Sequence, residues 1–154
     1  MIYPIGEYGC KLDAKGRLLL PSSFKEQLGT ALDDGFVLRP GLYERCLDMF
    51  GMDDWRKLQE RLGKMNSFKK ETLIIQRRIN AGARLVKIDG SGRLQIPKDL
   101  LEKCGMVKDV VISSLTDRMQ IWGSEQLEKS NAEVSDEDFM KMLEDNLGNV
   151  DFNG

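Results

Sequence analysis

The chain has 154 residues, of which 41% are hydrophobic and 31% charged, and this composition is typical of a folded globular protein. No apolar run approaches the ~20 residues of a membrane-spanning helix, and the first ten residues lack the basic and apolar segments of a signal peptide, so we expect a cytoplasmic protein without a membrane partner. The net charge of −2 is unevenly distributed: residues 1–123 carry +5 and residues 124–154 carry −7, and a basic body is compatible with a polyanionic partner.

The sequence offers little for metal or enzyme chemistry. It has three scattered cysteines, Cys10, Cys46 and Cys104, no Cys-x-x-Cys pair and no histidine. Zinc sites are built mostly from closely spaced Cys and His, so we expect reduced cysteines in or near a core, with no metal and no cofactor. The P-loop, nucleophile-elbow and zinc-protease motifs are also absent, so we do not expect an enzyme.

The most informative feature is an internal repeat. Residues 11–29, KLDAKGRLLLPSSFKEQLG, align without a gap on residues 87–105, KIDGSGRLQIPKDLLEKCG. The two segments share Lys, Asp, Gly, Arg, Leu, Pro, Glu and a final Gly at matching places. Such a repeat predicts two copies of one structural unit in the chain.

Each copy begins with residues that favour a tight turn. Asp13 and Asp89 can accept hydrogen bonds from backbone groups two residues further on. Gly16 and Gly92 supply the positive φ that a hairpin loop with a bulge requires. We therefore expect two equivalent, solvent-facing hairpin turns shaped by these four residues. The two carboxylates could serve acid–base chemistry if they met in a pocket, but turn formation is the simpler role.

A strand and a short helix are expected after each turn. Leucines and an isoleucine alternate at strand spacing from residue 18 to 20 and from 94 to 96. A proline then ends the strand, a capping box starts the helix and a glycine stops it. The residues for these roles are Pro21, Ser23 with Glu26, and Gly29 in the first copy, and Pro97, Asp99 with Glu102, and Gly105 in the second.

Further elements follow each copy. Apolar runs predict strands over residues 36–40, 45–51, 109–114 and 118–123. Phe50 and Trp122 are expected to be core or core-edge aromatics rather than a platform for a ligand. Between the copies, Asp53 or Asp54 can cap a helix that runs to about Leu62 and stops at Gly63, and a second helix is expected over about residues 67–80. Near the C-terminus, Ser135 can cap a helix whose apolar stripe is Phe139, Met142, Leu143 and Leu147.

These elements predict an α+β fold that is mainly β. One half could not bury enough apolar surface alone, so we expect two pseudo-symmetric halves forming one small β-barrel with peripheral helices. The expected divisions are a first half at 1–52, a helical linker at 53–82, a second half at 83–125 and an acidic tail at 126–154.

The side chains around the two turns are the candidate binding site. Lys11, Lys15 and Arg17 surround the first turn, and Lys87, Ser91 and Arg93 surround the second. An arginine beside a glycine-opened backbone suits bidentate contacts to phosphate or to the edge of guanine, and a hairpin tip is slim enough to enter a major groove. The alternative interpretations are that these are ordinary solvated turns, or that each arginine pairs with a nearby acid.

Four blocks in order resemble the MraZ family: GEYGCKLDAKGRLLLP, GLYERCLDMF, RRINAGARLVKIDGSGRLQIP and DRMQIW. The resemblance covers roughly residues 5–127 and implies two AbrB-like swapped-hairpin halves in one chain. It also implies a sequence-specific bacterial transcription regulator, expected to be a repressor, of the division and cell-wall gene cluster. The family's DNA-reading signature maps onto Asp13, Lys15, Gly16 and Arg17, and onto Asp89, Gly92 and Arg93.

The resemblance carries expectations about partners. Members form rings and bind short direct repeats in the promoter region of their own operon, which implies double-stranded promoter DNA, a ring-like homo-oligomer (for example an octamer) and a nucleoid location. Ser91 stands where the first turn has Lys15, so whether the second turn contributes equally is open. The alternatives are a protein-interaction scaffold whose turns bind an acidic partner, and an AbrB-type antitoxin whose tail masks a toxin.

Overall fold

The computed structural model describes residues 2–148, which form a mixed α/β fold around a six-stranded antiparallel sheet. The strand order is β1-β7-β8-β4-β3-β5, and β2 and β6 form a separate antiparallel ladder. The expected mainly β fold with peripheral helices is therefore confirmed. The strands are β1 (Glu7–Lys11), β2 (Arg17–Leu19), β3 (Phe36–Pro40), β4 (Leu47–Gly51), β5 (Arg84–Val86), β6 (Arg93–Gln95), β7 (Asp109–Ser114) and β8 (Met119–Gly123).

The two halves exchange strands across the sheet. β1 of the first half pairs with β7 of the second, with Glu7 opposite Ser113, and β5 of the second half pairs with β3 of the first, with Phe36 opposite Val86. The central strands β3 and β4 are almost continuously buried, whereas the edge strand β1 alternates between exposed and half-buried residues. This reciprocal pairing makes each half depend on the other for a complete sheet.

The β2–β6 ladder connects the two ends of the sheet. Single bridges join Leu12, after β1, to Leu18, and Ile88, after β5, to Leu94. The pairings therefore run through all eight strands in a circle, with one bridge at each of the two joints. Leu18 and Leu94 are fully buried at these joints, in one hydrophobic core shared by both halves. Cys46 and Cys104 are buried and Cys10 is half-buried, and all three are free thiols, as expected.

Short helices follow the ladder strands in both halves. They are α1 (Ser22–Leu28), which continues into a 3₁₀ segment (Gly29–Asp34), and α4 (Lys98–Lys103). The predicted capping boxes were wrong: Pro21 and Pro97 occupy the N-cap positions, and neither helix has a side-chain cap. Since proline has its φ preset and no N–H to satisfy, each helix starts directly after it, and Ser23 and Asp99 already lie inside the first turn. The glycine stops are confirmed, because Gly29 and Gly105 have φ values of +57° and +65°.

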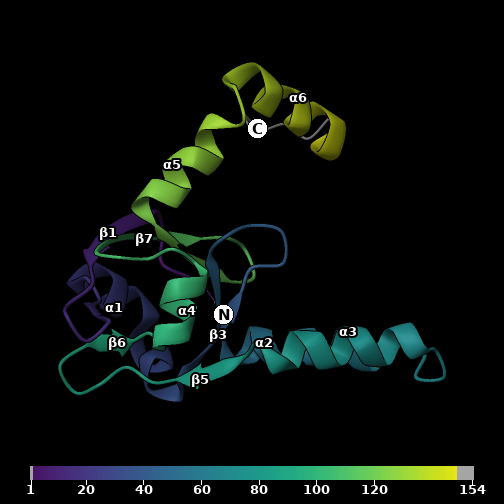
Figure 1. Ribbon diagram of the computed structural model, residues 1–154, viewed down its shortest axis with the longest axis horizontal. Coiled ribbons are helices and arrows are strands. Elements are labelled where there is room, and N and C mark those ends of the chain that lie inside the picture. The colour runs from purple at the N-terminus through teal and green to yellow at the C-terminus, as the bar shows by residue number, and fades with distance from the viewer. Residues whose placement is uncertain (1, 149–154) are drawn as a thin grey trace.

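Two helical arms extend from the body in different directions (Figure 1). The first arm consists of α2 (Met52–Gly63) and α3 (Lys70–Ala81), and the second of α5 (Ser124–Ala132) and α6 (Asp136–Leu147). Both arms start after the glycine that ends a hairpin, since Gly51 and Gly123 are the N-caps of α2 and α5. Asp53 and Asp54 lie in the first turn of α2 and do not cap it, contrary to expectation, and α3 starts three residues later than predicted.

Within the described range, none of these helices combines the length and the apolar character needed to cross a bilayer. Phe50 and Trp122 end matching strands and are 1% and 3% exposed, so they are core aromatics, as predicted.

Candidate nucleic-acid interface

The first turn is held by one aspartate. Oδ1 of Asp13 accepts hydrogen bonds from the backbone N–H groups of Lys15 and Arg17, both at 2.9 Å, and Oδ2 accepts one from Nε of Arg17 at 2.9 Å. The backbone closes the loop as Asp13 N–H donates to the Arg17 carbonyl at 2.8 Å and Gly16 N–H donates to the Asp13 carbonyl at 3.0 Å. Gly16 has a φ of +75°, which is the left-handed conformation that the sequence predicted there.

The second turn repeats this network residue by residue. Oδ1 of Asp89 accepts from the backbone of Ser91 at 2.8 Å and of Arg93 at 2.9 Å, and Oδ2 accepts from Nε of Arg93 at 3.1 Å. Gly92 has a φ of +77°. The sequence repeat therefore corresponds to two turns of the same geometry, and the loop-shaping roles of all four predicted residues are visible in the hydrogen bonds.

The ladder holds the two turns side by side. Leu20 N–H donates to the carbonyl of Gly92 at 3.1 Å, and Ile96 N–H donates to the carbonyl of Gly16 at 3.0 Å. A further contact is unsymmetrical, because Nε2 of Gln95 donates to the Lys15 carbonyl at 2.7 Å, whereas Leu19 occupies the matching place in the other half. The two turns thus form one rigid pair, related by the pseudo-twofold axis of the β2–β6 ladder.

Both arginines are oriented by their own turns. The ion pairs with Asp13 and Asp89 use Nε only, and the Arg17 and Arg93 side chains remain 26% and 33% exposed. Hydrogen bonds from the backbone N–H of Arg17 and of Arg93 are the largest cause of the lowered pKa values of Asp13 and Asp89, so both carboxylates are charged at neutral pH. Local pairing, one of the alternatives, is therefore present, but within residues 2–148 the two terminal nitrogens of each guanidinium have no recorded hydrogen bond or ion pair.

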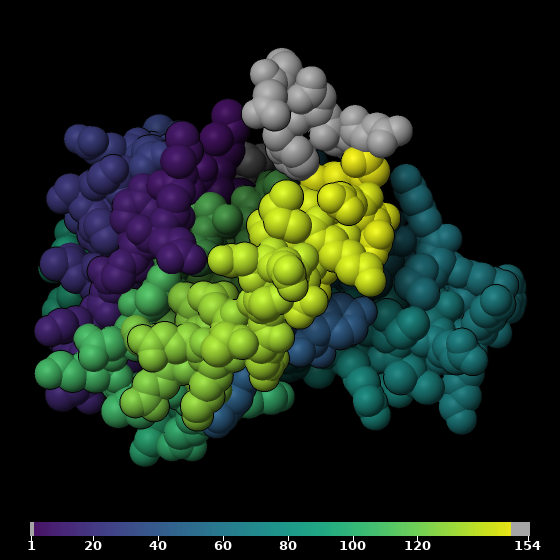
Figure 2. All heavy atoms as spheres, turned by 90° about the horizontal axis from the view of Figure 1, so that it is seen from above, coloured from purple at the N-terminus to yellow at the C-terminus, as the bar shows by residue number. Residues whose placement is uncertain are grey.

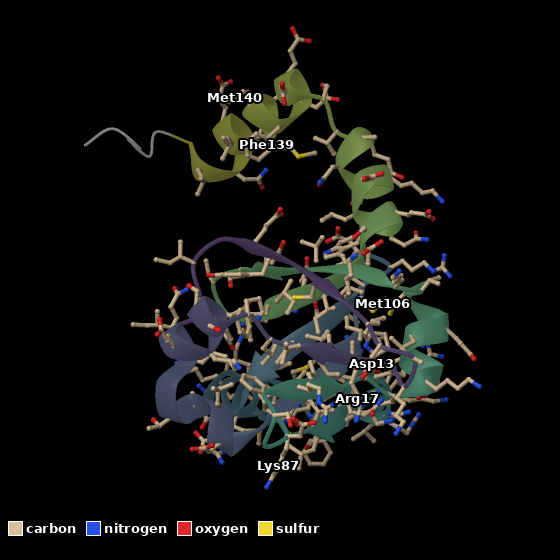
Figure 3. The ribbon with its side chains drawn as sticks, turned by 90° about the vertical axis from the view of Figure 1, so that its left-hand side faces the viewer. Asp13, Arg17, Lys87, Met106, Phe139 and Met140 are labelled. Atoms are coloured by element: carbon tan, nitrogen blue, oxygen red, sulfur yellow. The ribbon has the colours of Figure 1, made fainter. Side chains whose placement is uncertain are left out.

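The remaining predicted residues lie around this pair of turns. Lys15 and Ser91 are exposed within the turns, whereas Lys11 ends β1, opposite Asp109, and Lys87 directly follows β5. Figure 3 shows Asp13, Arg17 and Lys87 in the lower part of the body, away from α6. The structure thus places the two turns side by side, and the six candidate residues occupy equivalent positions of the two halves.

Lys25 is a neighbour of the second turn that sequence reasoning missed. A Cβ placed on Gly92 would lie 2.5 Å from Nζ of Lys25, so this ammonium group rests directly on the turn. In the first half the matching contact is between Gly16 and Cδ1 of Leu101. Lys25 therefore supplies a cation beside Ser91, where the second turn lacks the counterpart of Lys15. The signal in the sequence was the break in the repeat, where Lys25 aligns with Leu101.

The acidic helix α6 is remote from the turns. The predicted cap is confirmed, since Oγ of Ser135 accepts a hydrogen bond from the backbone N–H of Asp138 at 3.1 Å. No residue of α6 is buried, so its apolar stripe lies open. Within the described residues, no cluster of three or more His, Cys, Asp or Glu side chains could hold a metal ion.

Comparisons with known proteins identify the family. The family model described as "MraZ protein, putative antitoxin-like" matches twice, over residues 5–78 and 79–150. The chain is 42% identical to the transcriptional regulator MraZ of Christiangramia forsetii over all of this chain and 99% of that protein. It is 39% identical to the protein of the same name from Flavobacterium psychrophilum, over 95% of this chain and 92% of that protein. The repeated match, its extent and these identities show that the chain belongs to the MraZ family of transcriptional regulators.

Proposed function

We propose that this protein regulates transcription by binding double-stranded promoter DNA through its paired turns. The observation that carries the proposal is that matching hydrogen-bond networks on two adjacent turns orient Arg17 and Arg93 in the same way. In residues 2–148, the terminal nitrogens of both guanidinium groups have no recorded hydrogen bond or ion pair. Two parallel N–H groups fit the O6 and N7 atoms of guanine or the oxygens of a phosphate. The aspartates fix the side-chain conformation before DNA arrives, which lowers the entropic cost of binding.

The surrounding cations fit contacts to the DNA backbone. Lys11, Lys15 and Lys87 are exposed, and Lys25 lies beside the second turn. Flexible ammonium groups around two fixed guanidinium groups suit phosphate contacts that position the protein while the arginines read bases. Ser91 can add a hydrogen bond to a phosphate but no charge.

The proposal extends to the target and the assembly. Following the family resemblance, the DNA target is a set of short direct repeats in the promoter of the protein's own operon, within the division and cell-wall gene cluster, and the effect is repression in the nucleoid. One pair of turns makes few phosphate contacts, and such a surface binds DNA with a Kd of only ~10⁻⁴–10⁻⁶ M. A ring of subunits that meets several repeats gains a factor of ~10²–10⁴ through effective concentration.

The test compares Arg17→Ala and Arg93→Ala with Arg56→Ala on a labelled duplex from upstream of the coding sequence. Arg56 is a matched control because it is another exposed arginine paired with a neighbouring aspartate, Asp53, but lies on α2. Loss of a base contact should cost about 1–3 kcal/mol, which is about five- to 150-fold in Kd, and Arg56→Ala should change Kd little. A folded Arg17→Ala protein that binds the duplex like the unsubstituted protein would contradict the proposal.

A further inference from the structure

The two helical arms have opposite charge. The first arm (52–81) has a net charge of +4 and the second (124–147) one of −6. The two arms occupy matching places after β4 and β8, so their difference in charge is not a consequence of the repeat. It marks two surfaces of one molecule that are electrostatically complementary.

α6 of the second arm has an open apolar stripe with one acidic edge. The stripe differs from the predicted one by a single residue, because at 100° per residue Met140 lies beside Leu143 and Leu147, whereas Met142 lies outside them. Phe139, Met140 and Leu147 are 53%, 54% and 43% exposed, and Leu143 lies between them. At 100° per residue, Glu137 and Glu144 border this stripe, whereas Asp138 and Asp145 lie on the opposite side of the helix. A free amphipathic helix with this pattern is suited to lie in an apolar groove that has basic walls.

A groove of this kind lies where the first arm meets the body. It has a volume of about 490 Å³ and is formed by the end of α3, the end of β3 and helix α4. Its cations are Arg39, Arg78, Arg84 and Lys103, and its apolar residues include Leu42 and Leu100. We call it the basic groove.

The cations of the basic groove are mostly without a carboxylate partner. Arg84 pairs with Asp99 at 2.9 Å. Arg39 is 7% exposed and donates to the backbone carbonyls of Ile79 and Pro40. Among residues 2–148, no ion pair is recorded for Arg39, Arg78 or Lys103. Arg39 is also buried within the field of Asp48. Carboxylates that enter the groove would therefore meet two cations that have no recorded carboxylate partner in residues 2–148, Arg78 and Lys103.

The two surfaces of one chain do not meet. α6 stands above the body, whereas α3 and β5, which border the groove, lie lower, and the loop between β3 and β4, which also borders it, lies on the upper side (Figure 1). Within residues 2–148, no hydrogen bond or ion pair is recorded between α6 and a groove residue. Seen from above, the second arm lies over the body, nearest the viewer (Figure 2). The burial of no α6 residue agrees with these views. The complementary surfaces are placed for contact between neighbouring molecules.

We propose that helix α6 of one molecule docks into the basic groove of a second copy, with Glu137 and Glu144 against Arg78 and Lys103 and the apolar stripe against Leu42, which is 60% exposed. Because this contact joins two different surfaces and each molecule has both, every molecule can bind one neighbour through α6 and another through its groove. The chain of subunits closes into a ring when the rotation from one subunit to the next adds up to a full turn. The inference rests on the assembly in the proposed function and names the interface that builds it.

The test uses matched charge reversals in the full chain, with the mass in solution measured by light scattering. The protein should have a mass several times the 17.5 kDa of one chain. Glu137→Lys/Glu144→Lys should raise the concentration needed for assembly at least tenfold. The control Asp138→Lys/Asp145→Lys makes the same charge change seven residues apart on the far side of α6 and should assemble as the unsubstituted protein does.

Mixing two variants tests the pairing itself. Arg78→Glu/Lys103→Glu should also assemble poorly alone, because the acidic edge of α6 on one copy then meets negative charges in the groove of the next. An equal mixture with Glu137→Lys/Glu144→Lys should assemble again, since each tail then meets a groove of opposite charge on the other variant. Phe139→Ser should weaken assembly without any charge change. Three results would overturn the inference: an unsubstituted protein that is monomeric, a Glu137→Lys/Glu144→Lys variant that assembles normally, or a mixture of the two variants that stays monomeric. If the protein is monomeric and its α6 is protected from protease, α6 docks into the groove of its own chain instead.

DNA binding separates this inference from the proposed function. The Glu137→Lys/Glu144→Lys variant should bind a duplex with one repeat about as the unsubstituted protein does, while losing its preference for the full promoter. The Arg17→Ala variant should form an assembly of the same mass in solution as the unsubstituted protein, but its affinity for DNA should be lower. If the Glu137→Lys/Glu144→Lys variant forms assemblies of unchanged mass while Arg17→Ala loses DNA binding, the proposed α6–groove interface is refuted and the proposed function still holds.

Discussion

Gly16→Ala should destabilise the protein more than Gly92→Ala, although the two glycines have the same turn geometry. Their φ values of +75° and +77° impose the same left-handed penalty on alanine, about 1–2 kcal/mol. The neighbours differ: a Cβ on Gly16 would lie 2.8 Å from Cδ1 of Leu101, whereas one on Gly92 would lie 2.5 Å from Nζ of Lys25. The Lys25 ammonium can swing into solvent, but Leu101 packs against the core and must be repacked, at about 1–3 kcal/mol more.

The expected costs are thus about 2–5 kcal/mol for Gly16→Ala and about 1–2 kcal/mol for Gly92→Ala. Urea unfolding followed by circular dichroism, at one protein concentration, measures both. A Leu101→Lys background supplies the control, because it gives the first turn the neighbour that the second turn has. In that background the cost of Gly16→Ala should fall toward that of Gly92→Ala. A larger cost at Gly92, or no coupling between positions 16 and 101, would refute the reasoning.

Three further predictions concern charge and chemistry. Ser91→Lys should tighten promoter binding and make the slope of log K against log salt concentration steeper by about one, as measured by fluorescence anisotropy. An unchanged slope would show that the second turn does not contact the phosphate backbone. Because hydrogen bonds from the arginine backbones hold the pKa values of Asp13 and Asp89 below 3.8, the stability they contribute is present above that pH and lost as pH falls through the lower folded values. The melting temperature should therefore show no loss from these groups between about pH 7 and 5, and a sharp fall centred near pH 5 would contradict this. Burial raises the pKa of all three thiols, that of Cys46 to about 12, and Cys10 is half-buried whereas Cys46 and Cys104 are buried. A thiol reagent near pH 8 should therefore modify Cys10 first, and rapid modification of two thiols would contradict the described core.

The turns could be predicted because their stabilising contacts are local. Asp13 bonds groups two and four residues ahead, and Gly16 lies inside the same loop, so a short stretch of sequence specifies the geometry. The position of Lys25 could not be predicted in this way. It lies 67 residues before Gly92 in the chain and reaches it only through the pairing of β2 with β6. The cap predictions failed for a local reason, since a proline already started each helix before Ser23 or Asp99.

The arms show a different limit of sequence reasoning. Residues 53–82 suggested a helical linker and residues 126–154 an acidic tail, because the two segments share little sequence and have net charges of opposite sign. Their common place in the repeat appears only when Gly51 and Gly123 are seen as equivalent N-caps after equivalent strands. Propensity identifies that a helix forms, whereas its place relative to a repeat depends on tertiary structure.

The exchange of strands between the halves has a consequence for how the chain folds during synthesis. Glu7 pairs with Ser113, a separation of 106 residues, so the first strand waits for most of the chain before it acquires its neighbour. Meanwhile β3 presents a free edge until β5 is made, and its sequence is almost entirely apolar. Pairings this distant slow folding, and unpaired apolar edges promote aggregation. A nascent first half should therefore bind chaperones until the second half has been synthesised. Ribosome stalling within the second half should prolong this aggregation-prone state.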